Sequence, residues 1–467
     1  MRVLQVGCGF RPWRRGGLVA YIEDLMREQV RRGDEVAYFF SGRMYPRNRG
    51  PSLRRWVRDD VTMYELVNSP LYDHGRQPAL EVAEPRVERL LAGVIEEFRP
   101  DVLHLQEVAG LPSSVLDVAR RLGVPTVVTL QDYFFVCPNF KLLDANGRVC
   151  HRTEVGASCI ATLSADPRPA GALFDATVSY DLEQIPAVQR IDAVRRDPHV
   201  RRVAAAVGRR AAPTSGPQGT ARDYQRRRQL NVARLNAADR VVAMSQRVAD
   251  IHVALGVDPA VMRTIHLTLG HIDELTPREA TLSGPLTFGT LGAFESVAKG
   301  GRLLLDAVRM LSDSAAAGRF RVVVYGWIMA GFAKEAAALD AIELRAPFAP
   351  DELDGMLDEV DVGLMPSVWE EAYGYAGIEF LAKAIPVVAN SIGGMTDYVR
   401  EGETGWLNAS RSAEELAGIM AGIVERPHQV VELNAALRAR RDELVKPMAR
   451  HADEMDAVYG EVAGAYR

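Results

Sequence analysis

The sequence predicts an α/β protein built from two doubly wound domains, each with a parallel sheet. Strand-like and helix-like segments alternate along most of the chain, which is the pattern of parallel sheets crossed by helices. The strand-like segments are short, apolar and rich in β-branched residues, as in buried parallel strands. A length of 467 residues fits two domains at roughly 100–200 residues each.

The first domain, assigned to residues 1–270, opens with a buried strand at Val3 to Val6. A loop ends at Gly16-Gly17, and residues 18–31 have the apolar spacing of a helix that Gly33 closes. Further strands are expected at EVAYFF, VLHL, TVVTL and RVVAMS, with the helix SSVLDVARRLG between VLHL and TVVTL.

An insertion interrupts this alternation at about residues 138–228. It contains cysteines, an arginine-rich stretch and a Pro/Gly/Ser-rich stretch, APTSGPQGTARDY. Its arginines would fit anionic lipid or an acidic acceptor. A solvated helix face is the more common role of such residues, so at most a peripheral membrane contact is expected.

The second domain is assigned to residues 278–445 and follows a linker at about 266–277. Residues 446–467 are predicted to form a last amphipathic helix. The strands expected in the second domain are LTFGTLG, FRVVVYG, DVGLMP and IPVVAN, and the helices are RLLLDAVRML, DELDGMLDEV and YAGIEFLAKA.

Composition excludes several classes of protein. The chain is 48% hydrophobic and 25% charged, which are globular values, and no apolar run approaches the ~18–20 residues of a membrane span. Its net charge of -5 is unlike that of nucleic-acid binders, which tend to be basic. Its N-terminus reads as a strand rather than a signal peptide, so a soluble, cytoplasmic protein is expected.

The richest candidate site lies in residues 366–407. A strand ends at Pro366, Glu371 lies in the next loop, and Glu379 sits about one turn inside the helix opened by Gly374 to Gly377. Two residues that are eight positions apart on one helix point ~80° apart and lie ~12 Å apart along the helix axis. This spacing suits one ligand touched at two ends, with the helix N-terminus over negative charge. The alternative is a pair of surface glutamates on a capped helix.

Three glycine-rich turns add weaker signals. Lys299, one of only five lysines, precedes a glycine pair and a helix, so its ammonium could meet an anion there. Gly393-Gly394 could cradle a phosphate, and Gly16-Gly17 could face the same anion across a cleft. As alternatives, a lone lysine at such a place is usually just solvated, and a bare Gly-Gly pair is as often only a turn.

Together these residues resemble the large retaining family 4 of nucleotide-sugar glycosyltransferases, which have the GT-B fold. Glu371 and Glu379 match the family's E-x7-E motif, Lys299-Gly300 its K-G motif and Gly16-Gly17 its N-terminal glycine loop. The resemblance covers both domains. It implies two facing Rossmann-like domains and a C-terminal helix that crosses back to the first.

The resemblance also implies roles for these residues. Glu371 would bind hydroxyls of the donor sugar, and Glu379 the ribose. Lys299 and the backbone N–H groups of the helix start would neutralise the departing diphosphate. Front-face displacement with retention would then need no metal or other cofactor. The expected co-substrate is a nucleotide diphosphate sugar, specifically a UDP-sugar. The donor-binding set is Gly16, Gly17, Lys299, Glu371, Gly374, Tyr375, Ala376, Gly377 and Glu379.

The chain departs from the family pattern at several positions. Ala293 stands where relatives commonly carry a phosphate-binding arginine, which Arg14, Arg15 or Arg302 could replace. Gln131 stands where many relatives have a histidine, so it would act there by hydrogen bonding alone.

Two other sets of residues leave alternatives open. His104 is a candidate on the acceptor side, although a histidine satisfied at a strand end is equally consistent. Cys137, Cys150 and Cys159 resemble part of a four-cysteine cluster of relatives, but Thr162 replaces the fourth cysteine. Buried free thiols are therefore expected rather than zinc.

The predicted function is transfer of a sugar from a nucleotide donor to a glycan or small-molecule acceptor, through a hydroxyl or an amine, with Lys299, Glu371, Gln131 and His104 as candidate catalytic residues. Two alternatives remain. One is a GT-B nucleotide-sugar epimerase, which would need no acceptor. The other is a non-catalytic GT-B subunit that binds a nucleotide or a partner.

Overall fold

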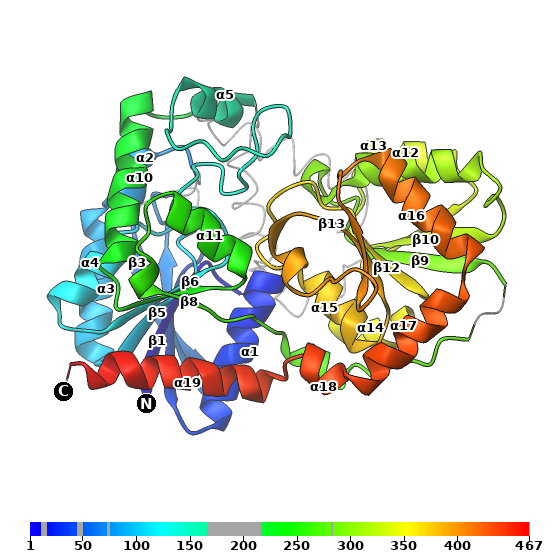
Figure 1. Cartoon of the computed structure of the whole chain (residues 1–467). Coiled ribbons are helices and arrows are strands. Elements are labelled where there is room, and N and C mark those ends of the chain that lie inside the picture. Colours follow the sequence, from blue (N-terminus) through cyan, green and yellow to red (C-terminus); the bar gives the residue numbers. More distant parts are fainter. Residues whose placement is uncertain (11–15, 44–49, 72–74, 166–215, 282–283, 467) are drawn as a thin grey trace, which may run out of the picture.

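The computed structural model describes residues 1–467 except 11–15, 44–49, 72–74, 166–215, 282–283 and 467. It forms two α/β halves, each built around a largely parallel sheet with helices on its faces (Figure 1). The predicted fold class, two doubly wound Rossmann-like domains, is confirmed.

The first sheet has eight strands in the order β3-β4-β2-β1-β5-β6-β7-β8. All neighbours run parallel except β3, which is antiparallel to β4. β1, β2, β5 and β6 are almost wholly buried, as their apolar runs predict. The bounds are β1 Arg2–Gly7, β2 Glu35–Ser41, β3 Ser52–Arg58, β4 Val61–Val67, β5 Val102–Leu105, β6 Thr126–Leu130, β7 Arg240–Ala243 and β8 Met262–Thr264.

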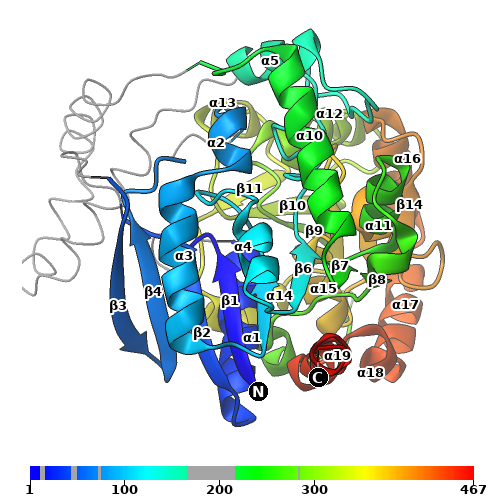
Figure 2. The same cartoon turned by 90° about the vertical axis from the view of Figure 1, so that its left-hand side faces the viewer.

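Helices pack around this sheet, with α3, α4 and α10 facing the viewer in Figure 2. Helix α10 begins at a capping box, in which Thr220 and Asp223 exchange side-chain and backbone hydrogen bonds. Among the described residues of this half, the helices are α1 Gly17–Arg31, α2 Pro78–Val82, α3 Pro85–Phe98, α4 Val115–Arg121, α5 Ala157–Ala165, α10 Ala221–Asn236 and α11 Gln246–Ala254.

The second sheet has six parallel strands in the order β11-β10-β9-β12-β13-β14. Its strands are β9 Leu286–Leu291, β10 Phe320–Tyr325, β11 Ile342–Arg345, β12 Val362–Met365, β13 Val387–Asn390 and β14 Gly405–Asn408. Its helices are α12 Gly301–Ser312, α13 Ala330–Ala336, α14 Leu353–Leu357, α15 Tyr375–Ala382, α16 Ala413–Glu425, α17 His428–Ala439 and α18 Arg441–Leu444. Short 3-10 turns occur along the described parts of both halves: η1 Pro259–Val261, η2 Gly270–Glu274, η3 Val297–Lys299, η4 Pro350–Glu352 and η5 Gly393–Asp397.

The last helix, α19 (Met448–Gly464), leaves the second half and packs under the first, against α1, β5 and β6 (Figure 1). Its apolar side chains Met455, Val458 and Val462 are buried in the core that contains the first sheet. The predicted crossover of the C-terminal helix is therefore confirmed.

The predicted insertion is only partly described. Residues 138–165 contain a short bridge between Leu143 and Val149 and then α5, and α10 begins within the last part of the predicted range. The arginine-rich stretch expected to face lipid or an acidic acceptor lies largely outside the described residues. The structure therefore does not test that expectation.

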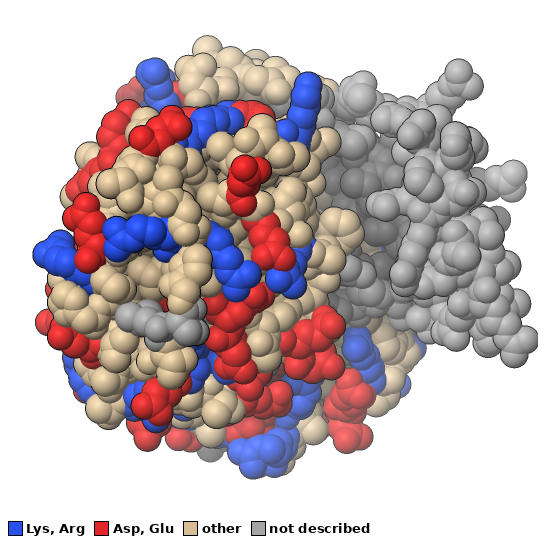
Figure 3. Space-filling model, turned by 90° about the vertical axis from the view of Figure 1, so that its right-hand side faces the viewer, with Lys and Arg blue, Asp and Glu red and all other residues tan. Residues whose placement is uncertain are grey.

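Both signs of charge alternate on the outer face of the C-terminal half (Figure 3). On α12 in this half, Arg302 pairs with Glu335, and Arg309 pairs with Asp306 and Glu335. Such exposed pairs contribute little to stability but keep a surface soluble. Within the described part of the chain, no helix is both long and apolar enough to cross a membrane.

Candidate active site

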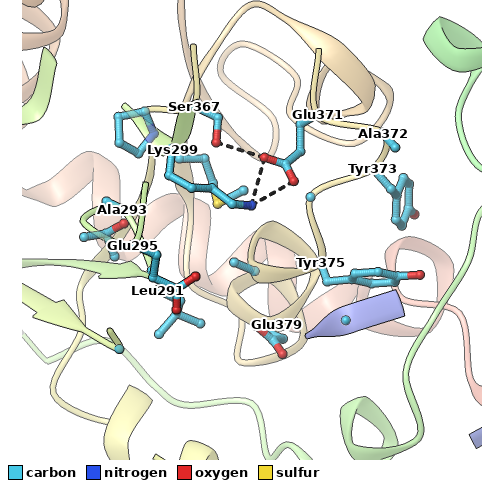
Figure 4. A pocket seen from close by; sticks show the side chains of 18 of the residues that line it. Leu291, Ala293, Glu295, Lys299, Ser367, Glu371, Ala372, Tyr373, Tyr375 and Glu379 are labelled. Carbon is cyan, nitrogen blue, oxygen red and sulfur yellow. Dashed lines mark hydrogen bonds and ion pairs between the residues drawn. The ribbon is translucent and has the colours of Figure 1, made fainter. Parts of the chain in front are cut away.

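A cavity of about 380 Å³ lies between the two halves. Residues at the carboxyl ends of both sheets line it, among them Gln131 after β6, Met244 after β7, Leu291 at the end of β9 and Pro366 after β12. Ligands of doubly wound sheets bind at these strand ends. The cavity is therefore the candidate active site (Figure 4).

Lys299 and Glu371 form an ion pair in this cavity. The Lys299 ammonium lies 2.9 and 3.0 Å from the two Glu371 carboxylate oxygens. Ser367 Oγ also donates to Glu371 Oε2 at 3.0 Å (Figure 4). Trp369 Nε1 donates to the same oxygen at 2.9 Å. The carboxylate is thereby fixed in place, and the lysine is held where an incoming anion could meet it.

The glycine after Lys299 is required by the backbone. Gly300 has φ +82°, and a Cβ there would lie 1.8 Å from the Pro366 carbonyl oxygen. Only glycine allows this close approach and this left-handed conformation. The K-G pair therefore brings Lys299 beside the loop that carries Glu371.

Two helices begin at the cavity from opposite halves. Gly374, Tyr375 and Ala376 at the start of α15 line it, and Gly17 at the start of α1 lines it from the other side. The approach is close, because a Cβ on Gly17 would lie 2.4 Å from Tyr375 Cδ2. Two helix N-termini at one cavity make an electropositive setting for an anion.

Glu379 lies inside α15 and reaches the same cavity. Its Oε1 is 2.7 Å from His271 Nε2, on η2 of the segment that connects the two sheets. Burial lowers the pKa of His271, but the hydrogen bond to Glu379 and the nearby Asp24 carboxylate outweigh this and raise it above its usual value. The imidazolium form therefore partly balances the Glu379 charge.

Glu295 is a third carboxyl group in the cavity, next to Lys299 (Figure 4). Burial raises the pKa of its carboxyl, while the Lys299 charge opposes that shift. Ala293, two residues earlier, also lines the cavity. Arg302, one of the candidate replacements for a phosphate-binding arginine, is instead paired with Glu335 outside the cavity, whereas Arg14 and Arg15 lie outside the described residues.

Most of the residues predicted for the site are brought together. Eight line the cavity: Gly17, Gln131, Lys299, Glu371, Gly374, Tyr375, Ala376 and Glu379. Gly16 precedes α1 as its N-cap, and Gly377 is buried in the first turn of α15, so both adjoin the cavity without lining it.

His104 does not line the cavity. Its side chain is fully buried and hydrogen-bonds to Tyr459 on α19 and to Thr129 on β6. Of the two alternatives open from the sequence, the structure therefore shows the satisfied histidine at a strand end. This corrects its assignment as a candidate catalytic residue.

Sequence reasoning missed Glu295, His271, Ser367 and Trp369. His271 is 108 residues from Glu379, so no local pattern links the two. Trp369 and Ser367 lie within four residues of Glu371, and both side chains can donate hydrogen bonds. Their closeness in sequence to a candidate carboxylate was therefore a signal that could have identified them.

A second, small cavity is lined by Arg228 together with Cys137, Cys150 and Cys159. The three cysteines are free thiols, and burial raises the pKa of Cys137 to about 11. The Arg228 guanidinium is buried among them, where a cation would repel a metal ion. Across the described residues, no three His, Cys, Asp or Glu side chains are arranged to hold a metal.

Two family sequence models match the chain. Glycosyl transferase 4-like domain matches residues 16–268, more than half of the chain, and Glycosyl transferases group 1 matches residues 285–426. The chain belongs to the family 4 glycosyltransferases. The E-x7-E and K-G motifs of the cavity fall within the second match.

Individual relatives agree with this membership. D-inositol 3-phosphate glycosyltransferase of Streptomyces bingchenggensis (strain BCW-1) is 30% identical over 261 residues, which is 50% of this chain and 55% of the relative. The 2-deoxystreptamine glucosyltransferase of Streptomyces kanamyceticus is 32% identical over 156 residues, 33% of this chain and 39% of the relative. The chain thus spans about half the length of the first curated relatives it matches.

Solved structures share the fold over almost the whole chain. Anabaena HepE in complex with UDP has a TM-score of 0.61 at 13% identity and covers 99% of this chain and 100% of its own. Sucrose-phosphate synthase of Thermosynechococcus elongatus has a TM-score of 0.62 at 15% identity, with 99% of both chains covered. At such low identity these similarities establish the GT-B fold.

Proposed function

We propose that this chain is a retaining glycosyltransferase that moves a sugar from a UDP-sugar to a hydroxyl or amine acceptor in the cytoplasm. The observation that carries the proposal is the meeting of Lys299, Glu371, Glu379 and the start of α15 in one cavity. A nucleotide sugar carries a ribose, a diphosphate and a sugar in series, and these groups match the polar features of that cavity.

The proposed mechanism assigns one role to each group. Glu379 binds ribose hydroxyls with the oxygen that His271 leaves free. Lys299 and the first-turn N–H groups of α15 stabilise the charge that develops on the departing diphosphate. Glu371, fixed by Ser367 and Trp369, accepts hydrogen bonds from the donor sugar.

Transfer would follow front-face displacement. The bond between the anomeric carbon and the phosphate oxygen breaks, and the acceptor oxygen or nitrogen bonds to the same face of that carbon. The leaving phosphate oxygen takes the acceptor proton. This step is balanced without a metal ion, which is why the proposal includes none.

The relatives suggest a class of acceptor. One relative's name refers to D-inositol 3-phosphate and another's to 2-deoxystreptamine, both of which are hydroxylated six-membered carbocycles. We therefore propose a ring-shaped polyol or amino polyol as the acceptor, and these two compounds are the first to test.

Nucleotide binding is tested by thermal unfolding with UDP, GDP, ADP and dTDP. At 100 times the dissociation constant a ligand adds ~2.7 kcal/mol to the unfolding free energy, which raises the melting temperature measurably. We expect UDP to stabilise the wild type and to lose most of this effect in Glu379→Ala. Stabilisation by none of the four diphosphates would contradict the proposal.

Catalysis is tested with UDP-glucose and each acceptor. Lys299→Met is expected to lower kcat by about 10²–10³, as for loss of one charge-stabilising group. Lys334→Met, which removes an exposed lysine on α13 of the same half, is the matched control and should leave kcat unchanged. An inverted anomeric configuration in the product, read by NMR, would contradict the retaining mechanism.

A further inference from the structure

The Gly393-Gly394 turn after β13 packs against the loop that carries Glu371. Gly393 has φ +63°, and a Cβ there would lie 2.4 Å from the Glu371 carbonyl oxygen. The Gly393 N–H group donates to Glu370 Oε2 at 3.1 Å. The Gly394 N–H group donates to the Glu371 carbonyl oxygen at 2.7 Å. Both glycine N–H groups therefore hold this loop, and neither is left to cradle a phosphate.

Glu370, the residue before Glu371, has a buried carboxylate that is saturated with donors. The residue is only 1% exposed. Its Oε1 lies 2.5 Å from Arg247 Nη2 and 2.7 Å from His151 Nε2. Its Oε2 accepts from Arg247 Nε at 3.0 Å and from the Gly393 N–H group. Two donors on each oxygen fill the capacity of a carboxylate, so Glu370 has no position left for a substrate.

The charged partners of Glu370 come from outside the second half. Arg247 is in the first turn of α11 in the first half, and His151 belongs to the described part of the predicted insertion. The N-cap of α11, Ser245, contacts the same loop, because its Oγ donates to the Ala372 carbonyl oxygen at 2.7 Å. The loop is therefore bound to the first half at the residues directly before and after Glu371.

Glu371 itself is held in two ways. Its carboxylate is bound inside the second half by Lys299 and Ser367 (Figure 4). Its backbone lies between two residues that are bound to the first half. Leaving a buried carboxylate such as that of Glu370 without its cationic partners is strongly unfavourable. The loop therefore keeps this position only while the first half and the insertion lie against it.

We propose that Glu370 is a positioning residue of the transferase: held by Arg247 and His151, it sets the backbone of Glu371 so that the Glu371 carboxylate meets the donor sugar. The proposal rests on the proposed function, in which Glu371 binds the sugar and Glu379 the ribose. UDP has no sugar and does not need Glu371. A loop displaced by about 1 Å should therefore weaken a UDP-sugar more than UDP.

The test compares the dissociation constants of UDP-glucose and UDP by titration calorimetry on the full-length protein. Arg247→Gln should raise the ratio of the two constants about fivefold or more, since the loop loses a charged partner. Arg247→Lys keeps the charge and should raise it less. His151 is exposed, so His151→Asn should fold normally and raise the ratio about twofold or more.

Arg240→Gln is the matched control for Arg247→Gln. Arg240 on β7 pairs with Glu461 on α19, so the change also breaks an arginine–glutamate pair of the first half, but away from the loop. If Arg240→Gln raises the ratio as much as Arg247→Gln does, the effect is only structural and the proposal is wrong.

The remaining outcomes also decide the proposal. An unchanged ratio in both Arg247→Gln and His151→Asn would overturn it. If Arg247→Gln does not fold, as judged by thermal unfolding, His151→Asn alone decides. Failure of the wild type to bind UDP would instead contradict the proposed function.

Discussion

Glu370 and Glu371 are neighbours in the chain, yet their carboxylates bind opposite halves of the molecule. Glu371 turns to Lys299 in the second half. Glu370 is bound by Arg247 of α11, at 2.5 and 3.0 Å, and by His151 of the predicted insertion, at 2.7 Å. One loop thus joins the candidate active-site cavity to the first half.

The Glu370 carboxylate is expected to hold the two halves together. Burial raises its pKa, but hydrogen bonds from His151 and Arg247 outweigh this and bring the pKa to about 2. In a double-mutant cycle with Glu370→Gln and Arg247→Gln, we expect a coupling of about 1–3 kcal/mol in the unfolding free energy. A coupling near zero, measured by urea unfolding, would mean that the pair does not form in solution.

Gly17→Ala should disturb the contact between α1 and α15. The added methyl would clash with the Tyr375 ring, so we expect a loss of about 1–3 kcal/mol in unfolding free energy and weaker UDP binding. Gly93→Ala, in α3 with no atom within 4 Å of the new Cβ, should instead be neutral or stabilise by up to about 1 kcal/mol. A Gly17→Ala protein as stable as the wild type would contradict the contact.

The His271–Glu379 pair predicts a loss of stability in alkaline solution. Because the folded-state pKa of His271 is raised, the folded protein holds a proton that the unfolded chain releases first. The contribution of His271 to the unfolding free energy is therefore complete below its unfolded-state pKa of about 6.5. It is lost as the pH rises through the folded-state pKa. Urea unfolding between about pH 6 and 9 should show a decline that His271→Asn reduces, and an unchanged decline would argue against the pair.

His252 predicts the opposite trend in acid. Burial lowers its pKa to about 4, so its folded ring stays neutral while the unfolded chain takes up a proton below about 6.5. As the pH falls from 6.5 to 4, His252 should therefore lower the unfolding free energy of the wild type by about 3 kcal/mol. This loss should be absent in His252→Gln. His428→Asn, an exposed change on α17, is the control.

Much of the fold could be predicted because the central strands are continuous apolar runs. The strands missed from the sequence were β3, β4, β8, β11 and β14. β3 is an exposed edge strand with the sequence SLRRWVR, so no apolar run marks it. The helix expected over DELDGMLDEV is α only at Leu353–Leu357, because Pro350–Glu352 form a 3-10 turn and the chain then turns towards β12.

The residues of the candidate site were predictable only where they belong to a short sequence motif. Lys299, Glu371 and Glu379 each lie in a short pattern near a strand end or a helix start, and all three line one cavity. The contact of His271 with Glu379 and the hydrogen bond from Gln131 to Gln106 join side chains from distant parts of the chain. Only tertiary packing brings them together, and the same packing places His104 in the interior rather than in the cavity.

The position of α19 has a consequence for biosynthesis. The ribosome makes residues 448–464 after both sheets, yet Tyr459 completes the hydrogen bonds of Gln5, Gln29 and His104 inside the first half. Until that helix has left the exit tunnel, these groups and the apolar surface that Met455 and Val458 cover are open to water. The N-terminal half therefore reaches its final packing only after α19 has been made, and a chain stalled before Met448 would expose a surface suited to chaperone binding.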